Sequence, residues 1–275
     1  MNTLSQLHIA FIGGGNMASA ILGGCIANGL PAANVTVVDP NASQRDALTS
    51  RWPIHALAQA SDDLQAADIV IWAVKPQVLK EVALATQPHT RASALHLSVA
   101  AGVTSQSLAT WLRSDNIVRA MPNTPALVGA GATALYAREG VAATDQQKVT
   151  ALLEATGVVL WVPKESDLEG VTAVSGSGPA YVFYWLEAMV QAGVELGLSE
   201  QTAKQLAIAT FQGAAKLADS SPESPGVLRE RVTSKGGTTF EALESMRGDQ
   251  VGEAIVKAMH ACARRARELG EEFGS

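Results

Sequence analysis

The sequence predicts an α/β domain with a mostly parallel sheet, followed by an all-α domain. Two observations predict this order. Up to about residue 160, short apolar runs alternate with amphipathic stretches, which is typical of strand–helix–strand units. Beyond about residue 165 the strand-like runs stop and only helix-like segments follow. We therefore place the domains at 1–162 and 163–275.

Each predicted strand is a short apolar run, and each predicted helix has apolar residues at helical spacing. The strands are expected at 8–12, 35–38, 68–74, 94–99, 116–121, 133–137 and 158–162, with helices at 17–27, 77–86 and 145–156 between them. In the second domain, helices are expected at 179–196, 200–218, 226–233, 240–246 and 252–269. Ser199 is the predicted N-cap of the second of these.

Composition and charge narrow the function classes. The net charge is −6, and no basic stripe is present, so we expect no nucleic-acid partner. Cys25 and Cys262 lie far apart, and neither they nor the five histidines have metal-ligand spacing, so we expect free thiols and no metal site. No secretory signal is visible, and Glu187 and Gln191 interrupt the most apolar helix. These features favour a cytoplasmic protein without a membrane span.

A glycine-rich turn follows the first predicted strand. Gly13-Gly14-Gly15-Asn16-Met17-Ala18 has the pattern G-x-G-x-x-A and leads directly into a helix. In this context the first glycine permits a tight turn, Gly15 allows backbone to approach a pyrophosphate, and Ala18 allows close helix–sheet packing. The pattern therefore favours a Rossmann-type dinucleotide site, with a plain strand-to-helix turn as the alternative.

Asp39 ends the second predicted strand, where an acidic residue commonly binds the adenine ribose. That would favour NAD(H), but Arg45 could offset the charge if the following loop folds back. Equally, Asp39 could form a turn that caps the next helix. The cofactor is therefore NADP(H) or NAD(H), and the choice stays open.

Five segments in this order are similar to the pyrroline-5-carboxylate reductase family: AVKPQ at 73–77, SVAAG at 98–102, RAMPNTP at 119–125, AVSGSGPAYVF at 173–183 and VTSKGGTTFEAL at 232–243. The resemblance covers essentially the whole chain. It implies the reduction of a cyclic imino acid to proline by hydride from NADPH or NADH, as the last step of proline biosynthesis.

The resemblance also implies cofactor contacts on several loops. The pyrophosphate would lie on Ile12, Gly13, Gly14, Gly15, Asn16 and Met17, and the rest of the cofactor on Ala73, Val74, Lys75, Pro76, Val99, Ala100, Ala101 and Asn123. The family commonly has an asparagine where this chain has Ala60, so one polar contact is missing or replaced.

The segment Ser234–Thr239 can also be interpreted from its residues alone, without the resemblance. Thr238-x-x-Glu241 has the pattern of a capping box, which predicts a helix starting at Thr238, and the two preceding glycines would let N–H groups converge on an anion. A capped helix without a ligand is the alternative. The resemblance implies that Ser234, Gly236, Gly237 and Thr238 bind the substrate carboxylate and that Thr239 is the catalytic hydroxyl at the ring nitrogen. It also places Glu165 near the substrate, although a surface glutamate in a turn is an equal alternative.

Position 235 departs from the family, which usually has proline where this chain has lysine. Lys235 makes the turn less pre-organised but adds a cation, and Arg231 offers another. The resemblance further implies a homodimer through the helical domain and larger rings of dimers.

Two other classes compete with an imine reductase. A β-hydroxyacid dehydrogenase would need a lysine on the helix that opens the second domain, and the helix beginning GPAYVFYW has none. A cofactor-binding sensor would not need a glycine-rich anion turn in its second domain. A reductase of a related imine remains the nearest alternative.

Overall fold

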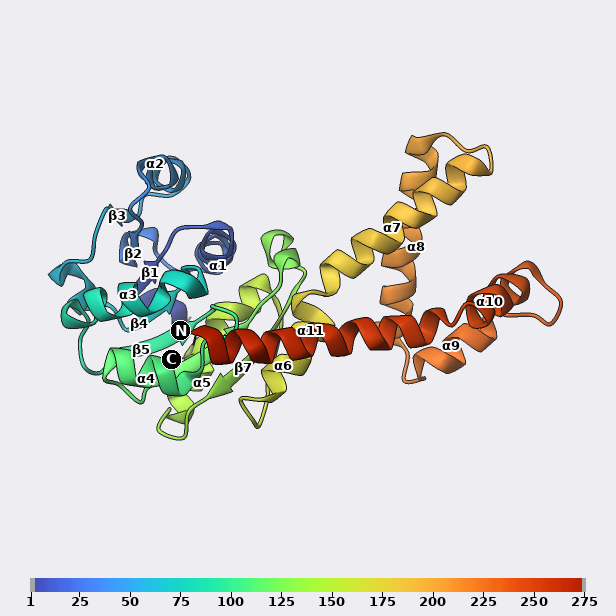
Figure 1. The fold of residues 1–275 in the computed structure, drawn as a ribbon. Helices are drawn as coiled ribbons and strands as arrows, with labels where there is room; N and C mark the ends of the chain where they lie inside the picture. Colours follow the sequence, from blue (N-terminus) through green and yellow to red (C-terminus); the bar gives the residue numbers. More distant parts are fainter. Residues whose placement is uncertain (1–2, 274–275) are drawn as a thin grey trace. The chain divides into compact units, whose positions relative to one another are not determined.

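The computed structural model describes residues 3–273, which form two compact units (Figure 1). The first, here the sheet unit, runs to Ser177 and resumes at Cys262, so that it includes the C-terminal part of the last helix. The second, here the helical unit, is Gly178–Ala261.

The sheet unit is built on one eight-stranded sheet in the order β3-β2-β1-β4-β5-β6-β7-β8. All neighbouring pairs are parallel except β6 and β7, which are antiparallel. The strands are β1 Ile9–Ile12, β2 Val35–Val38, β3 His55–Leu57, β4 Ile69–Trp72, β5 Leu95–Ser98, β6 Ile117–Met121, β7 Gly131–Ala137 and β8 Gly157–Trp161. The predicted mostly parallel sheet is confirmed, and all seven predicted strands are present.

Helices cover both faces of this sheet. They are α1 Asn16–Ala27, α2 Ala42–Arg51, α3 Pro76–Thr86, α4 Ser105–Leu112, α5 Ala143–Leu153 and α6 Asp167–Val171. Every residue of β1, β4 and β5 is buried, as expected for central parallel strands with helices on both sides. Two separate apolar clusters result, one containing Ile21 and Leu152 from α1 and α5, the other Leu79 and Leu108 from α3 and α4.

The sheet unit extends beyond residue 162, where we expected the first domain to end. Glu165 is bound to Ser105 and Arg119, and Asn123 is bound to the carbonyl of Ser175. The chain therefore packs against the sheet through α6 and the π-helical turn Thr172–Gly176 before it leaves at Ser177. The compact units thus differ from the expected division at 162/163 because these polar contacts hold the connecting segment to the sheet.

The helical unit contains α7 Gly178–Glu195, α8 Glu200–Ser220, α9 Pro225–Arg231, α10 Thr238–Gly248 and the first part of α11 Val251–Phe273. All five predicted helices are present. Ser199 caps α8 by accepting a hydrogen bond from the N–H of Thr202, as predicted. The hydroxyl of Ser175 donates a hydrogen bond to the carbonyl of Val171 at the π-helical turn.

Very few side chains of the helical unit are buried within the described chain. Only Ala203 and Ala207 of α8 reach that state, and no residue of α7, α9, α10 or α11 does. An apolar pocket of about 440 Å³ lies between α7 and the start of α11, lined by residues that include Tyr181, Trp185 and Ile255. The unit therefore leaves most of its apolar surface uncovered by its own chain.

Candidate active site

The glycine turn is shaped by its contact with the loop after β4. Gly13 has φ +95°, and a Cβ at this position would lie 2.7 Å from the carbonyl oxygen of Ala73. A residue with a side chain would have a strained backbone at this φ and would clash with Ala73, so the tight turn requires glycine at position 13. Gly15 has no atom within 4 Å of where its Cβ would stand. The space beside Gly15 is open, which is what close approach of a ligand to backbone requires.

Gly15 is also the N-cap of α1, and as a glycine it offers no side chain to the helix N–H groups. The first turn of α1 therefore presents free backbone donors and the positive end of the helix dipole. Ala18 is buried at the sheet, which brings the helix close to β1, as the motif predicts. This geometry suits a pyrophosphate.

Asp39 stands directly after β2 and is tied to the glycine turn. One carboxylate oxygen accepts a hydrogen bond from the N–H of Gly14 at 2.8 Å, and the other accepts one from Asn41 at 2.9 Å. Asn41, not Asp39, caps α2, because its side chain accepts from the N–H of Ser43. The alternative in which Asp39 caps the next helix is therefore wrong, although it does form the predicted short-range turn.

Arg45 folds back over this loop, as the cofactor argument required. Its guanidinium donates to the carbonyl oxygens of Asp39 at 2.8 Å and Pro40 at 3.0 Å. A cation and a carboxylate thus lie together at the end of β2.

The next two loops predicted to bind the cofactor follow β4 and β5, at the same edge of the sheet as the glycine turn. The N–H of Ala73 donates to Ile12 at 2.8 Å, and the N–H of Val99 donates to Trp72 at 3.1 Å. The cofactor candidates on these loops are Ala73, Val74, Lys75 and Pro76 after β4, and Val99, Ala100 and Ala101 after β5. The carboxyl ends of adjacent parallel strands are the usual place for a ligand in such sheets. Ala60 packs against an apolar cluster instead of offering a polar group.

Asn123 uses its side-chain amide within the protein. Its Nδ2 donates to the carbonyl of Ser175 at 3.0 Å, and its Oδ1 accepts from the N–H of Ala132 at 2.9 Å. The residue is buried and joins the loop after β6 to β7 and to the π-helical turn. Its side chain is therefore a structural connection, and only one amide hydrogen remains for another partner.

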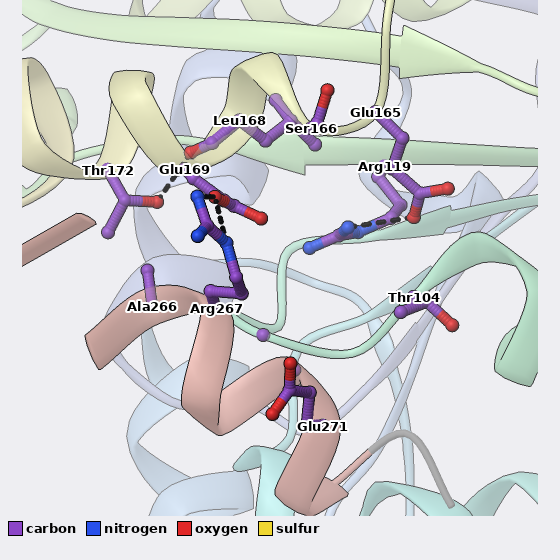
Figure 2. A pocket seen from close by; sticks show the side chains of 12 residues that line it. Thr104, Arg119, Glu165, Ser166, Leu168, Glu169, Thr172, Ala266, Arg267 and Glu271 are labelled. Atoms are coloured by element: carbon purple, nitrogen blue, oxygen red, sulfur yellow. Dashed lines mark hydrogen bonds and ion pairs between the residues drawn. The ribbon is translucent and has the colours of Figure 1, made fainter. Parts of the chain in front are cut away.

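Glu165 is one of the residues that line a pocket of the sheet unit with a volume of about 640 Å³ (Figure 2). Its Oε1 accepts hydrogen bonds from the N–H of Ser105 at 2.5 Å and from Arg119 at 2.8 Å. Its Oε2 accepts from the hydroxyl of Ser105 at 2.6 Å. The alternative of a surface glutamate is therefore wrong, because the carboxylate is half-buried and fully engaged.

The pKa of Glu165 follows from these contacts. Burial by itself raises the pKa of a carboxyl group, but the two hydrogen bonds from Ser105 and the ion pair with Arg119 outweigh it and hold the pKa of Glu165 below its ordinary value. Glu165 is therefore an anion at neutral pH.

The opposite wall of this pocket comes from the C-terminal part of α11. Arg267 donates from Nε and Nη2 to one oxygen of Glu169 at 3.0 and 2.8 Å. A Cβ on Gly270 would lie 3.0 Å from the carbonyl of Gly102, so the helix touches the loop that continues from Ala101. Figure 2 shows Arg119 and Glu165 facing one another on one side, with Arg267 and Glu169 on the other.

The predicted substrate turn lies in the helical unit. Gly236 has φ +73°, and the N–H of Gly237 donates to the carbonyl of Ser234 at 2.9 Å. The helix α10 starts at Thr238 as predicted, but its N-cap is Gly237 and no side chain caps it. The capping box is therefore not formed, and the first turn of α10 keeps its N–H groups free of a side-chain partner. Ser234 and Thr239 are exposed beside it.

Sequence reasoning missed Arg119 and Ser105. The signal for Arg119 was a charged residue in the middle of the apolar strand β6, since a cation in such a place needs a partner. Ser105 gave no comparable signal, because its role depends on a residue far along the chain.

The part of the chain that the structure describes contains no group of three or more His, Cys, Asp and Glu side chains arranged to hold a metal ion. None of its helices combines the length and the apolar character needed to cross a membrane.

The sheet, the open glycine turn and the loops that meet it define a Rossmann-type dinucleotide-binding protein. Comparisons with known proteins refine this class. The family described as pyrroline-5-carboxylate reductase dimerisation matches residues 165–269, and the one described as NADP oxidoreductase, coenzyme F420-dependent, matches residues 8–102. The chain is 42% identical over 272 residues to a pyrroline-5-carboxylate reductase from Pseudomonas aeruginosa, covering 98% of this chain and 100% of the relative.

Solved structures agree. A pyrroline-5-carboxylate reductase from Coxiella burnetii is 39% identical with a TM-score of 0.86, covering 96% of this chain and 98% of the other. The Plasmodium falciparum pyrroline carboxylate reductase with NADP bound is 28% identical with a TM-score of 0.86, covering 97% and 99%. The chain belongs to the pyrroline-5-carboxylate reductase family.

Proposed function

We propose that this protein reduces 1-pyrroline-5-carboxylate to L-proline with a hydride from NADPH or NADH. The observation that carries the proposal is the uncapped N-terminus of α1 beside the open space at Gly15, in a chain of this family. A protonated cyclic imine is already an electrophile, so the protein must mainly hold the ring against the reduced cofactor and exclude competing geometries.

The residues present fit a nicotinamide dinucleotide, which when bound supplies the hydride. The turn from Ile12 to Met17 would hold the pyrophosphate, and the loops from Ala73 to Pro76 and from Val99 to Ala101 would hold the nicotinamide half. Asp39 and Arg45 would flank the adenine ribose. Because both Asp39 oxygens already accept N–H groups of the chain, its ability to reject a 2′-phosphate is reduced, and Arg45 adds a cation there. Either cofactor is therefore compatible with this end of the site.

The substrate would be held through the turn before α10. Its carboxylate would accept hydrogen bonds from Ser234 and from the N–H groups of Gly236 and Thr238, while Gly237, whose N–H donates to the carbonyl of Ser234, would line the same turn. Thr239 would bind the ring nitrogen through its hydroxyl. The uncapped start of α10 and the positive φ of Gly236 support this assignment, because both leave backbone donors available to an anion. Glu165 is proposed as a further substrate-binding residue.

The active protein is proposed to be a homodimer joined through its helical units. The family description that matches residues 165–269 names dimerisation, and the helical unit has exposed apolar side chains along α7 and α8. Stacking of such dimers into rings is a further step of the same proposal. The two free cysteines are consistent with the reducing cytoplasm as its compartment.

The first test is the oxidation of NADPH and NADH, followed by absorbance, with pyrroline-5-carboxylate as substrate and proline measured as product. Oxidation without proline, or none from folded protein, would move the function to another imine or to a binding role.

Two variants test the assigned sites. Gly15→Val should abolish cofactor binding without unfolding the protein, because the added side chain enters open space. Thr239→Ala should lower kcat far more than cofactor affinity. Normal turnover in Thr239→Ala would mean that a group other than the Thr239 hydroxyl binds the ring nitrogen.

A further inference from the structure

We propose that Arg119 is a positioning residue which, with Ser105, fixes the Glu165 carboxylate on the pocket wall as a permanent counter-charge for the cationic ring nitrogen of the substrate. In this role Glu165 does not donate the proton. The inference rests on the proposed function, because it needs an iminium substrate near Glu165.

The geometry of the carboxylate supports a fixed anion. Three donors from two elements converge on it: the N–H and hydroxyl of Ser105 at the start of α4, and the guanidinium of Arg119 from β6. Each oxygen accepts at least one of these hydrogen bonds. Three of the roughly four acceptor positions of the carboxylate are occupied, so protonation would weaken these charge-assisted hydrogen bonds.

Among the described residues, Arg119 is the cation that forms an ion pair with Glu165. The charged residues that line the same pocket are Glu169 from α6, and Arg267 and Glu271 from α11. Arg267 is bound to Glu169 through two nitrogens, while Glu271 adds a further negative charge. With Arg119 removed, the hydrogen bonds of Ser105 would be the remaining support of the half-buried Glu165 carboxylate.

Within the cluster of Ser105, Arg119 and Glu165, Ser105 is also close in sequence to the loop after β5, which is proposed to bind the cofactor. Ser105 follows Thr104, the N-cap of α4, and only Gly102 to Thr104 separate it from Ala101, which is assigned to the cofactor. The bond between Glu165 and Ser105 therefore fixes α6 against the end of this loop. A counter-charge held in this way keeps a constant distance from the cofactor segment, which a flexible glutamate would not.

The test is the pH dependence of kcat/KM for the wild type, Arg119→Gln, Arg119→Lys and Glu165→Gln. The wild type should be nearly flat from about pH 5.5 to neutral pH. In Arg119→Gln the ion pair is lost while the two Ser105 hydrogen bonds remain, so the acidic fall of kcat/KM should begin at a higher pH than in the wild type. Arg119→Lys should restore most of the flat profile. In Glu165→Gln, kcat/KM should be low at every pH and should show no additional fall on acidification.

A proton donor predicts the opposite sign. If Glu165 donated the proton, a higher pKa in Arg119→Gln would extend activity toward alkaline pH, and that result would overturn the inference. A uniform decrease with an unchanged profile would also overturn it, because it would assign Arg119 a purely structural role. Ser105→Ala, which loses one donor but keeps the N–H, gives a second variant should Arg119→Gln not fold.

Arg138→Gln is the matched control. Arg138 forms a comparable ion pair with Asp115 at 2.9 Å but does not line the pocket, so its pH profile should match the wild type. Cofactor affinity, measured by nicotinamide fluorescence, should be unchanged in all three arginine variants. An inactive wild type would refute the proposed function itself, whereas an active wild type with unmoved profiles would refute only the role of Arg119.

Discussion

The two units of this chain bury their side chains very differently. In the sheet unit, β1, β4 and β5 are buried throughout and two apolar clusters fill both faces of the sheet. In the helical unit only Ala203 and Ala207 are buried, although its helices have many large apolar side chains. Because hydrophobic burial is the main stabilising contribution in folding, the sheet unit is stabilised by its own core. In the helical unit, burial would be added by association through the exposed apolar surface, in line with the dimerisation family that matches residues 165–269.

Phe183→Asp should give the largest effect and tests this difference directly. Phe183 on α7 is 65% exposed, so in an isolated chain the change would cost little. If a second copy covers it, a buried carboxylate should weaken the dimer by about a thousandfold, or about 4 kcal/mol. Analytical ultracentrifugation over a concentration series measures this change.

Leu84→Asp is its control in the sheet unit. Leu84 on α3 is 52% exposed, and the substitution should leave the dimer intact. Equal association of both variants and the wild type would mean that the apolar side of α7 stays in water, and the comparison between the units would fail.

Gly157→Ala probes the dense packing of the sheet unit. Gly157 has φ +136°, and a Cβ there would lie 2.0 Å from the carbonyl oxygen of Gly131. Strand β8 would have to move away from β7, so we expect a loss of about 3 kcal/mol or more in the free energy of unfolding. Urea denaturation measures it. Gly140→Ala, where a Cβ would have no atom closer than 3.7 Å, is the control and should change stability far less.

His96 links the same core to pH. Trp72 donates to its Nδ1 at 3.3 Å, and burial lowers the pKa of His96 from 6.5 to about 4. Between these values the unfolded chain binds a proton that the folded chain does not, so stability falls as the pH decreases below 6.5. The loss reaches about 3 kcal/mol near pH 4.

Urea unfolding from about pH 7.5 to pH 5 should show this slope, and His96→Gln should remove most of it. His260→Gln, at an exposed position of α11 in the helical unit, should leave the slope unchanged. A slope that persists in His96→Gln would assign the acid sensitivity to other groups.

Helices and strands with a strong hydrophobic periodicity could be predicted from the sequence, whereas short elements with a weak periodicity could not. Strands such as β4, a run of four buried apolar residues, were identified, whereas β3 has only three residues and none is fully buried. The helices α4 and α6 were also missed. For α4, only eight residues long, the only local signal was the N-cap Thr104.

The candidate site shows the same limit. The glycine turn is a local motif, so its residues and geometry were predicted together. The Arg119–Glu165 pair joins residues that are far apart in sequence, and no periodicity reports such a contact. The contacts that hold α6 to the sheet are likewise long-range and polar, so no local pattern indicates them.

Gly213→Ala should give the smallest effect and sharpens the comparison within the helical unit. Gly213 lies inside α8, and no atom stands within 4 Å of where its Cβ would be. Alanine should therefore stabilise the protein by about 0.5–1 kcal/mol through helix propensity, and Ala214→Gly beside it should destabilise by a similar amount. Thermal unfolding at fixed protein concentration measures both. If Gly213→Ala instead weakened the dimer, the glycine would mark a point where the second copy approaches the backbone of α8.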